Sequence, residues 1–179
     1  MRRIRAAAAS LAFGLAMLPA IVLASEPQTL RVIAQADLRV LDPIWTTAAV
    51  TRNYGYMIYD TLFAMDDHLR PQPQMVDRWA ISNDKLTYTF SLRERLKFSD
   101  GKPVRSSDCI ASIKRWSRRD ALGQSLAAAI AEYRIIDDKK FSIILKQPFP
   151  LLIEALAKPD SNVPFVMPQR VAETSPDEQ

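Results

Sequence analysis

The segment Leu86–Arg93 constrains the fold of this chain more than any other part of its sequence. Its letters, LTYTFSLR, place a large apolar residue at every second position and polar residues between them. Side chains alternate between the two faces of a β-strand, so this pattern predicts a strand with one face buried and one face solvated. The chain therefore builds at least part of a half-buried sheet.

Two further strands are predicted as a hairpin later in the chain. Tyr133–Ile136 and Phe141–Leu145 are apolar segments, and the charged run Asp137–Lys140 between them is typical of a turn. Leu151–Ala157 predicts a short helix after the prolines that end the hairpin. From Lys158 onward the sequence is rich in proline and predicts irregular structure.

A helix is predicted from Ser106 to about Arg118. The hydroxyl groups of Ser106 and Ser107 can cap its free N–H groups, and Asp108 supplies a carboxylate in the first turn. The apolar stripe of this helix consists of Cys109, Ile113 and Trp116.

The part of the chain before the alternating strand predicts one strand, one helix and one loop. Thr29–Ala34 is short, apolar and partly β-branched, which favours a buried strand. Apolar residues at spacings of three and four predict a helix that begins at Thr46 or Thr47 and reaches Phe63. The polar segment Asp66–Pro73 predicts a turn and loop.

The first 24 residues have the features of a secretory signal peptide. Three arginines precede an uncharged run, Ala6–Leu23, and small residues follow before the polar sequence that begins at Ser25. An uncleaved membrane anchor is the alternative, because a run of about 18 apolar residues can span a bilayer. Gly14 and Pro19 interrupt the run, so we favour cleavage after Ala24.

The net charge bears on possible partners only after this segment is set aside. The chain has 24 Lys and Arg residues and 20 Asp and Glu residues, for a net charge of +4. Three of the arginines lie in residues 1–24 and every acidic residue follows them, so the remainder is close to neutral. Composition therefore gives no support for nucleic-acid binding. The single cysteine, Cys109, excludes an internal disulfide and is expected to be a buried, inert thiol.

Residues that could support chemistry have simpler structural explanations. His68 is the only histidine and lies in a polar loop, where a solvated surface residue is expected. The acidic pairs Asp66–Asp67 and Asp137–Asp138 favour turn formation over paired catalytic carboxylates. The sequence contains no nucleophile elbow, glycine-rich phosphate loop or zinc-protease motif. No catalytic residue, no metal site and no cofactor are therefore expected.

Basic and aromatic residues are further candidates for binding groups. A solvated helix face is favoured over nucleic-acid or anionic-lipid contact for the basic cluster, which consists of Lys114, Arg115, Arg118 and Arg119. Core packing is expected for Trp79, Tyr88 and Phe90, whereas Trp45 lies in the linker between the first strand and the first helix.

Four blocks of the sequence resemble the family 5 extracellular solute-binding proteins of ABC transporters, the peptide-, dipeptide- and nickel-binding group. These are Leu41–Pro43, Tyr59–Phe63, Pro73–Trp79 and, most specifically, Leu86–Cys109. In the last block an alternating aromatic strand is followed by Leu-Arg, an aromatic residue close to Asp-Gly, a proline, and an aspartate that starts a helix. The resemblance extends from about Leu30 to Val171, nearly all of the chain after the signal.

The resemblance implies a mixed α/β fold of the two-lobed type II (flytrap) periplasmic-binding-protein class. It implies a signal peptide at residues 1–24, the first strand and linker of the main lobe at 25–45, and a satellite α+β subdomain at 46–158. Residues 159–179 would begin the return to the main lobe. We expect that the second lobe and the C-terminal part of such a receptor lie outside these 179 residues.

The function implied is the periplasmic substrate-binding component of an ABC importer, with peptides as the expected solute. The implied partners are a peptide or other small solute and the permease subunits, with a monomeric receptor and no nucleic acid. By the same resemblance, the cleft residues are Thr46, Thr47, Ala48 and Ala49 from the first lobe, and Gln124 and Ser125 after the basic helix. Capping of a helix by Thr46 or Thr47 is an equally weighted alternative.

Two other functional classes remain open from the sequence alone. One is a secreted hydrolase, against which the lack of a nucleophile–base or metal constellation argues. The other is an interaction or chaperone-like module that uses an exposed lobe surface. A flytrap receptor holds its ligand between two lobes, so this chain alone is expected to bind peptide weakly and to be poorly stable.

Overall fold

The computed structural model describes residues 29–175 and residue 177. The chain divides into a unit that ends at Ile33 and a unit that begins at Ala34, and each is described by itself. In the first unit residues 29–33 are irregular, and Leu30, Val32 and Ile33 are exposed. The predicted strand at Thr29–Ala34 is therefore wrong here, because a strand requires a hydrogen-bonded neighbour and this segment has none among the described residues.

The predicted signal peptide at residues 1–24 lies outside the described residues. Within the described part of the chain, the structure contains no helix that combines the length and apolar character needed to cross a bilayer.

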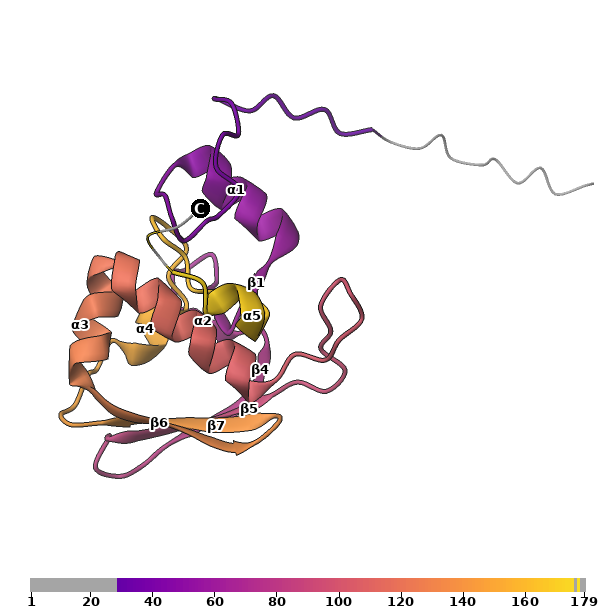
Figure 1. The fold of residues 1–179 in the computed structure, drawn as a ribbon. Helices are drawn as coiled ribbons and strands as arrows, with labels where there is room; N and C mark the ends of the chain where they lie inside the picture. The colour runs from indigo at the N-terminus through magenta and orange to yellow at the C-terminus, as the bar shows by residue number, and fades with distance from the viewer. Residues whose placement is uncertain (1–28, 176, 178–179) are drawn as a thin grey trace, which may run out of the picture. The chain divides into compact units, whose positions relative to one another are not determined.

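A four-stranded antiparallel sheet with the strand order β4-β5-β7-β6 dominates the unit that begins at Ala34 (Figure 1). Its strands are β4 (Val76–Ile81), β5 (Thr87–Leu92), β6 (Ile130–Asp137) and β7 (Lys140–Leu145). The alternating pattern of β5 is confirmed, because Tyr88, Phe90 and Leu92 are buried and the residues between them are only half-buried. The predicted hairpin is also confirmed as the pair β6–β7.

Helices α2 (Ser106–Arg119) and α3 (Ala121–Ala129) lie on one side of this sheet (Figure 1). The predicted helix from Ser106 is confirmed, and its stripe of Cys109, Ile113 and Trp116 is buried. Its capping differs from the prediction, since the hydroxyl of Ser106 is buried without a hydrogen-bond partner among the described residues. The carboxylate of Asp108 caps instead, and it accepts from the backbone N–H of Arg105 at 2.8 Å.

Helix α1 (Ala49–Ile58) is the predicted N-terminal helix, with different ends. Ala48 occupies the N-cap position without a side-chain cap, and Thr46 accepts a hydrogen bond from the N–H of Ala48 at 3.2 Å in the turn before the helix. The predicted end at Phe63 is wrong, because Tyr59 is already extended.

Three short strands follow α1. They are β1 (Asp60–Thr61), β2 (Phe63–Met65) and β3 (Pro71–Pro73), and β2 pairs with β3. Leu62 and Phe63 are 2% and 0% exposed, so both pack into the core. These two residues are apolar because they pack into the core, and not because the helix continues to them. Local spacing cannot distinguish burial by distant elements from burial along one helix face.

The C-terminal part of the described chain is more regular than its prolines predict. Helix α4 (Leu152–Leu156) confirms the predicted short helix. Strand β8 (Phe165–Val166) pairs antiparallel with β1, and helix α5 (Gln169–Ala172) follows it. The prediction of irregular structure from Lys158 onward is therefore wrong at β8, where pairing with β1 stabilises an extended segment, and at the helix α5.

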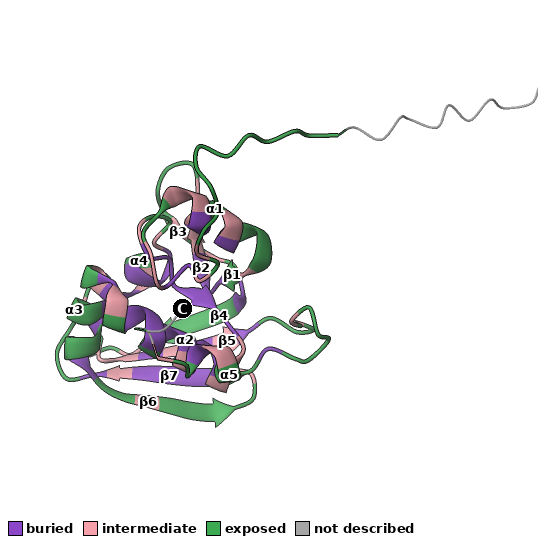
Figure 2. Ribbon diagram, turned by 45° about the horizontal axis from the view of Figure 1, so that its top comes forward, coloured by how far each residue is buried: buried purple, intermediate pink, exposed green. Residues whose placement is uncertain are grey.

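The core is built from aromatic side chains of separate elements. The rings of Phe63 and Phe90 have centroids 5.9 Å apart, and those of Phe90 and Phe141 are 5.3 Å apart. Figure 2 shows that burial is concentrated in β7 and α2, while the edge strand β6 is largely exposed. Trp79 on the other edge strand, β4, is 41% exposed, which corrects its expected place in the core. Cys109 is buried as predicted, and burial raises the pKa of its thiol.

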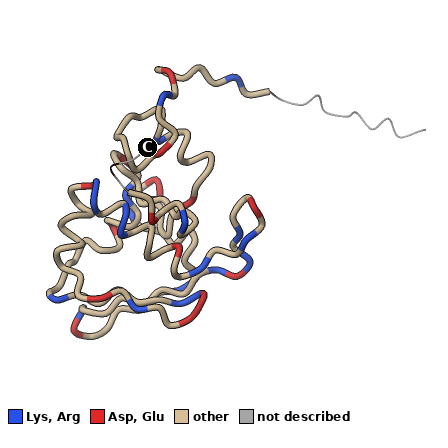
Figure 3. The backbone as a smooth tube through the Cα atoms, viewed as in Figure 1, with Lys and Arg blue, Asp and Glu red and all other residues tan. Residues whose placement is uncertain are grey.

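Charged side chains of both signs are distributed over the described chain. Figure 3 shows Lys and Arg interleaved with Asp and Glu along the helices and the hairpins. This arrangement agrees with the nearly neutral composition of the chain after residue 24.

Candidate functional site

The segment Asp42–Thr46, which leads into the predicted ligand contacts, is fixed by a side chain of α2. Arg115 donates to both carboxylate oxygens of Asp42, with Nη1–Oδ1 at 3.1 Å and Nη2–Oδ2 at 2.6 Å. It also donates to the carbonyl groups of Thr174 and Ser175 at 3.3 and 3.4 Å. Only 3% of the Arg115 side chain is exposed, so the guanidinium of this two-bond ion pair is shielded from water.

The predicted solvated face of α2 is therefore wrong for Arg115, and it is wrong in part for Arg119. Nη2 of Arg119 donates to the carbonyl of Trp45 at 3.1 Å, and its guanidinium lies 4.6 Å from the centroid of the Trp45 ring. Lys114 and Arg118 are exposed, as predicted. Local sequence does not indicate the difference, because Asp42 and Trp45, which bind these arginines, lie more than 70 residues earlier in the chain.

A buried asparagine, Asn162, holds the same segment through a second set of contacts. Its Nδ2 lies 3.0 Å from the carbonyl oxygen of Ile44 and 3.2 Å from that of Thr46, and the residue is 4% exposed. Its own carbonyl accepts from Nε1 of Trp116 at 2.7 Å. Sequence reasoning missed Asn162, because it lies in the segment that the prolines predicted to be irregular.

The predicted contacts at 46–49 lie between this segment and α1. Thr46 and Ala49 are half-buried, whereas Thr47 and Ala48 are exposed. Thr46 and Ala48 line a shallow hollow of about 280 Å³, together with residues 36, 37, 39 and 40 and the start of α1. Because Ala48 takes the N-cap position, the hydroxyl of Thr47 has no capping role, and it makes no hydrogen bond to a described residue.

The second predicted group, Gln124 and Ser125, lies on the exposed face of α3. Nε2 of Gln124 donates to the carbonyl of Arg118 at 3.2 Å, and the Ser125 hydroxyl donates to the carbonyl of Ala121 at 3.1 Å. The carboxylate of Asp120 caps α3 by accepting from Gly123 N–H at 3.0 Å. Within the described residues, no hydrogen bond joins this group to residues 46–49.

A larger hollow, of about 680 Å³, lies away from both predicted groups. It is lined by residues 56–61 at the end of α1 and β1, by the loop 97–100, and by residues 166, 168, 170 and 171 around α5. Tyr59 lines it and also lines a second hollow of about 530 Å³ beside Asp42 and Arg115. Burial, with a smaller contribution from the charge of Asp42, raises the pKa of the Tyr59 hydroxyl. The phenol therefore stays neutral and can donate or accept hydrogen bonds.

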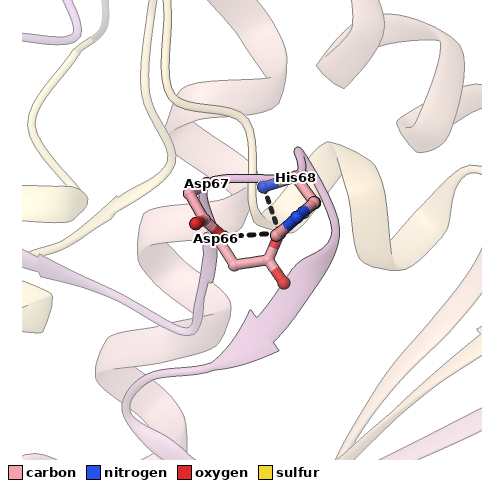
Figure 4. A group of neighbouring side chains, drawn as sticks. All are labelled: Asp66, Asp67 and His68. Carbon is pink, nitrogen blue, oxygen red and sulfur yellow. Dashed lines mark hydrogen bonds and ion pairs between the residues drawn. The ribbon is translucent and has the colours of Figure 1, made fainter.

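The one group of potential metal ligands among the described residues is the loop Asp66–His68, shown in Figure 4. Asp66 accepts from the backbone N–H groups of His68 and Arg70, each at 2.9 Å, which confirms its predicted role in a turn. Nε of Arg70 also donates to it at 2.9 Å. These bonds lower the pKa of Asp66 to about 2, the backbone bond from Arg70 contributing most. A cation would have to compete with these donors for the carboxylate.

The sequence matches the model of the family described as bacterial extracellular solute-binding proteins, family 5 Middle, over residues 70–178. It is 42% identical over 147 residues to the probable peptide ABC transporter periplasmic-binding protein y4tO of Sinorhizobium fredii, covering 82% of this chain and 27% of that protein. It is 29% identical over 155 residues to the glutathione-binding protein GsiB of Salmonella typhimurium, covering 86% of this chain and 30% of that protein. The chain thus spans less than a third of these relatives.

Solved structures of periplasmic binding proteins have the same fold over this region. The binding protein MoaA of A. tumefaciens R10, in complex with mannopinic acid, superposes with a TM-score of 0.64 and 25% identity, over 75% of this chain and 28% of that one. OppA of Listeria monocytogenes, bound to peptide, gives 0.61 and 24% identity, over 72% and 28%. At that identity the second likeness concerns the fold alone.

Proposed function

The chain belongs to the family 5 bacterial extracellular solute-binding proteins, and from this membership we propose that it is the N-terminal part of the substrate-binding component of an ABC importer for peptides. The mixed α/β fold is that of the periplasmic binding proteins. The family is one of transport proteins and not of enzymes. The observation that carries the proposal is the family match over residues 70–178, which covers the sheet and α2.

Peptides are the proposed solute class because of the names that the relatives bear. One relative is described as a probable peptide-binding protein of an ABC transporter, and another as a glutathione-binding protein; glutathione is itself a tripeptide. A peptide presents backbone N–H and C=O groups, which small hydroxyl side chains and exposed backbone can bind without regard to sequence. The exposed residues Thr47 and Ala48 suit that kind of contact.

The proposed arrangement of the chain follows the family resemblance. Residues 46–158 form a satellite α+β subdomain, residues 25–45 start the main lobe, and residues 159–179 start the return to it. The contacts Asn162–Ile44 and Asn162–Thr46 support this layout, because they bring the outgoing and returning segments together. Thr46, Thr47, Ala48 and Ala49, with Gln124 and Ser125, are the proposed contacts to the solute.

The proposed partners are the permease subunits of the importer, and the proposed location is the periplasm. Export through a cleaved signal at residues 1–24 and a monomeric state in solution complete the proposal. Hand-over of a solute involves no covalent change, so no catalytic residue is required.

Photo-cross-linking tests the proposal even where binding is weak. Benzoylphenylalanine is placed at Thr47, and the chain is irradiated with biotinylated trialanine. We expect a cross-linked product that excess unlabelled trialanine or glutathione abolishes. The matched control carries the same photoreactive residue at Asn83, which is exposed in the turn between β4 and β5.

Equal cross-linking from positions 47 and 83, or a Thr47 product that no competitor removes, would contradict peptide binding at this site. Mass spectrometry of the trialanine probe after incubation separates binding from hydrolysis. An intact probe agrees with a binding protein, and cleaved probe would point to the secreted hydrolase instead.

A further inference from the structure

The segment that follows residue 158 lies against α1 and against the linker that precedes it. The hydroxyl of Tyr56 donates to the carbonyl of Pro159 at 3.0 Å, and Arg52 forms an ion pair with Asp160. Asn162 donates to the carbonyl of Ile44, in the linker before α1. The partners in these contacts are 103 to 118 residues apart in the sequence, so they arise from the fold and not from local structure.

The contacts of Asn162 are suited to fixing a turn of backbone. Its Nδ2 carries two hydrogens, which can be donated to the carbonyl oxygens of Ile44 and Thr46 at 3.0 and 3.2 Å, while the oxygen of Pro43 lies farther away at 3.5 Å. A nitrogen, and not an oxygen, must face these carbonyl groups, since oxygen would have nothing to donate. At 4% exposure, water cannot replace the bonds.

Asn162 is itself anchored to α2. Its backbone carbonyl accepts from the indole N–H of Trp116 at 2.7 Å, and the Trp116 side chain is fully buried. The same returning segment reaches α3 through an ion pair between Lys158 and Asp120, the residue that caps α3. Residues 158–162 therefore contact the linker that precedes Thr47 and Ala48, and also the residue that caps α3, the helix that carries the second predicted group.

We propose that Asn162 is a positioning residue for ligand binding: its side-chain amide holds the backbone of Ile44–Thr46 so that Thr47 and Ala48 are presented to the solute. The proposal rests on the function proposed above. Asn162 itself does not touch the solute, and its effect passes through the carbonyl groups of Ile44 and Thr46.

Asn162→Asp tests this role, because it keeps the shape of the side chain and replaces the donating amide with a carboxylate. Hydrogen exchange of the full chain, followed by mass spectrometry, measures how often the backbone of residues 42–49 opens. We expect exchange there to accelerate by about tenfold or more, as loss of a buried hydrogen bond predicts. Exchange in β5 and β7 should change much less.

Asn83→Asp is the matched control, since it makes the same chemical change at an exposed turn and should leave residues 42–49 unaltered. If the aspartate variant of Asn162 does not unfold cooperatively, Asn162→Ser removes the amide donor without adding a charge. Unchanged exchange at residues 42–49 in a folded variant would overturn the positioning role, whatever the yield of the peptide cross-link.

The effect of Asn162 on solute binding is measured by the yield of the trialanine cross-link at position 47. A yield that falls with Asn162→Asp, and keeps its parent value with Asn83→Asp, supports the role in binding. Faster exchange with an undiminished yield would show that the held backbone does not matter for the solute, and the proposal would fail. Absence of any cross-link in the parent chain contradicts the proposed function and the ligand role together, while exchange still decides whether Asn162 holds the segment.

Discussion

Arg115 and Asp42 lie 73 residues apart in the sequence and meet in a two-bond ion pair, with Nη2 and Oδ2 2.6 Å apart. The arginine side chain is 3% exposed and the aspartate side chain 18%. Burial removes the guanidinium from water. Its bonds to the carboxylate of Asp42 and to the carbonyl groups of Thr174 and Ser175 must therefore compensate for the lost hydration. This pair attaches the linker before α1 to the middle of α2.

Replacement of Arg115 by Met should destabilise the protein strongly. Removing one partner of a buried pair leaves the other charge uncompensated, and the usual cost is about 3–5 kcal/mol. Because Asp42 retains some access to water, we expect the lower end, about 3 kcal/mol. Urea unfolding followed by circular dichroism measures it. Arg118→Met, on the exposed face of the same helix, should change stability by less than about 0.5 kcal/mol; equal losses from the two variants would contradict the buried pair.

Gly123→Ala should lower stability, against the usual gain of about 1 kcal/mol for this change inside a helix. An added Cβ would lie 2.7 Å from the Cα of Ser117 and 3.2 Å from the Trp116 ring. The first neighbour is backbone and cannot move aside without shifting α2. Overpacking of this kind costs about 1–3 kcal/mol. Thermal unfolding of this variant beside Ser125→Ala, an exposed position of the same helix, checks the sign.

Cys109 should not react with a thiol reagent in the native protein. Its side chain is 0% exposed, and burial raises the pKa of the thiol, so neither access nor thiolate is available at neutral pH. Ellman's reagent should label one thiol per chain in urea and none in buffer. An Asn83→Cys variant provides the reactive control, since its new thiol is exposed; comparable labelling of native Cys109 would show that α2 opens readily.

Asp66 should contribute to stability in a manner that depends on pH. Its pKa is lowered from 3.8 to about 2 in the folded chain, chiefly by the backbone bond from Arg70. A depressed pKa stabilises the fold above 3.8, and that contribution is lost as the pH falls from 3.8 toward 2. Asp66→Asn should therefore be less stable than the parent at neutral pH, and the difference should shrink in acid. A difference that stays constant over this range would contradict the assigned bonds.

Export should remove residues 1–24. When the chain is produced in a Gram-negative host, the periplasmic fraction should contain a product whose N-terminal sequence begins Ser-Glu-Pro, from Ser25. Replacement of Ala24 by Asp should block processing, because signal cleavage requires a small residue there. Retention of the full-length chain in the membrane fraction of the parent would favour the uncleaved anchor.

Elements with a strong local period could be predicted from the sequence. The alternation around Phe90 identified β5, and the stripe through Trp116 identified α2, because each pattern reflects a face that these residues themselves bury. The most specific family block, Leu86–Cys109, runs from β5 to the start of α2. The most specific part of the family resemblance therefore coincides with the local patterns that predict these two elements.

Features that depend on distant partners could not be predicted in this way. Arg115 fits a solvated face because nothing near it in the sequence shows that Asp42 lies against it. Leu62 and Phe63 fit a helical spacing, yet both are buried by tertiary packing after the helix has ended. The role of Asn162 depends on contacts with Ile44 and Thr46, more than 110 residues away.

The meeting of Thr46 and Asn162 has a consequence for how such a chain can change. The carbonyl of Thr46 and the side chain of Asn162 are 3.2 Å apart, so the whole of residues 47–161 leaves and returns at nearly one point. The stretch nevertheless contacts residues outside it, since β1 pairs with β8 and Arg115 binds Asp42. Recombination among relatives at positions 46 and 162 would therefore join the backbone easily, but the new stretch would also have to fit Asp42 and Phe165 on the retained part of the chain.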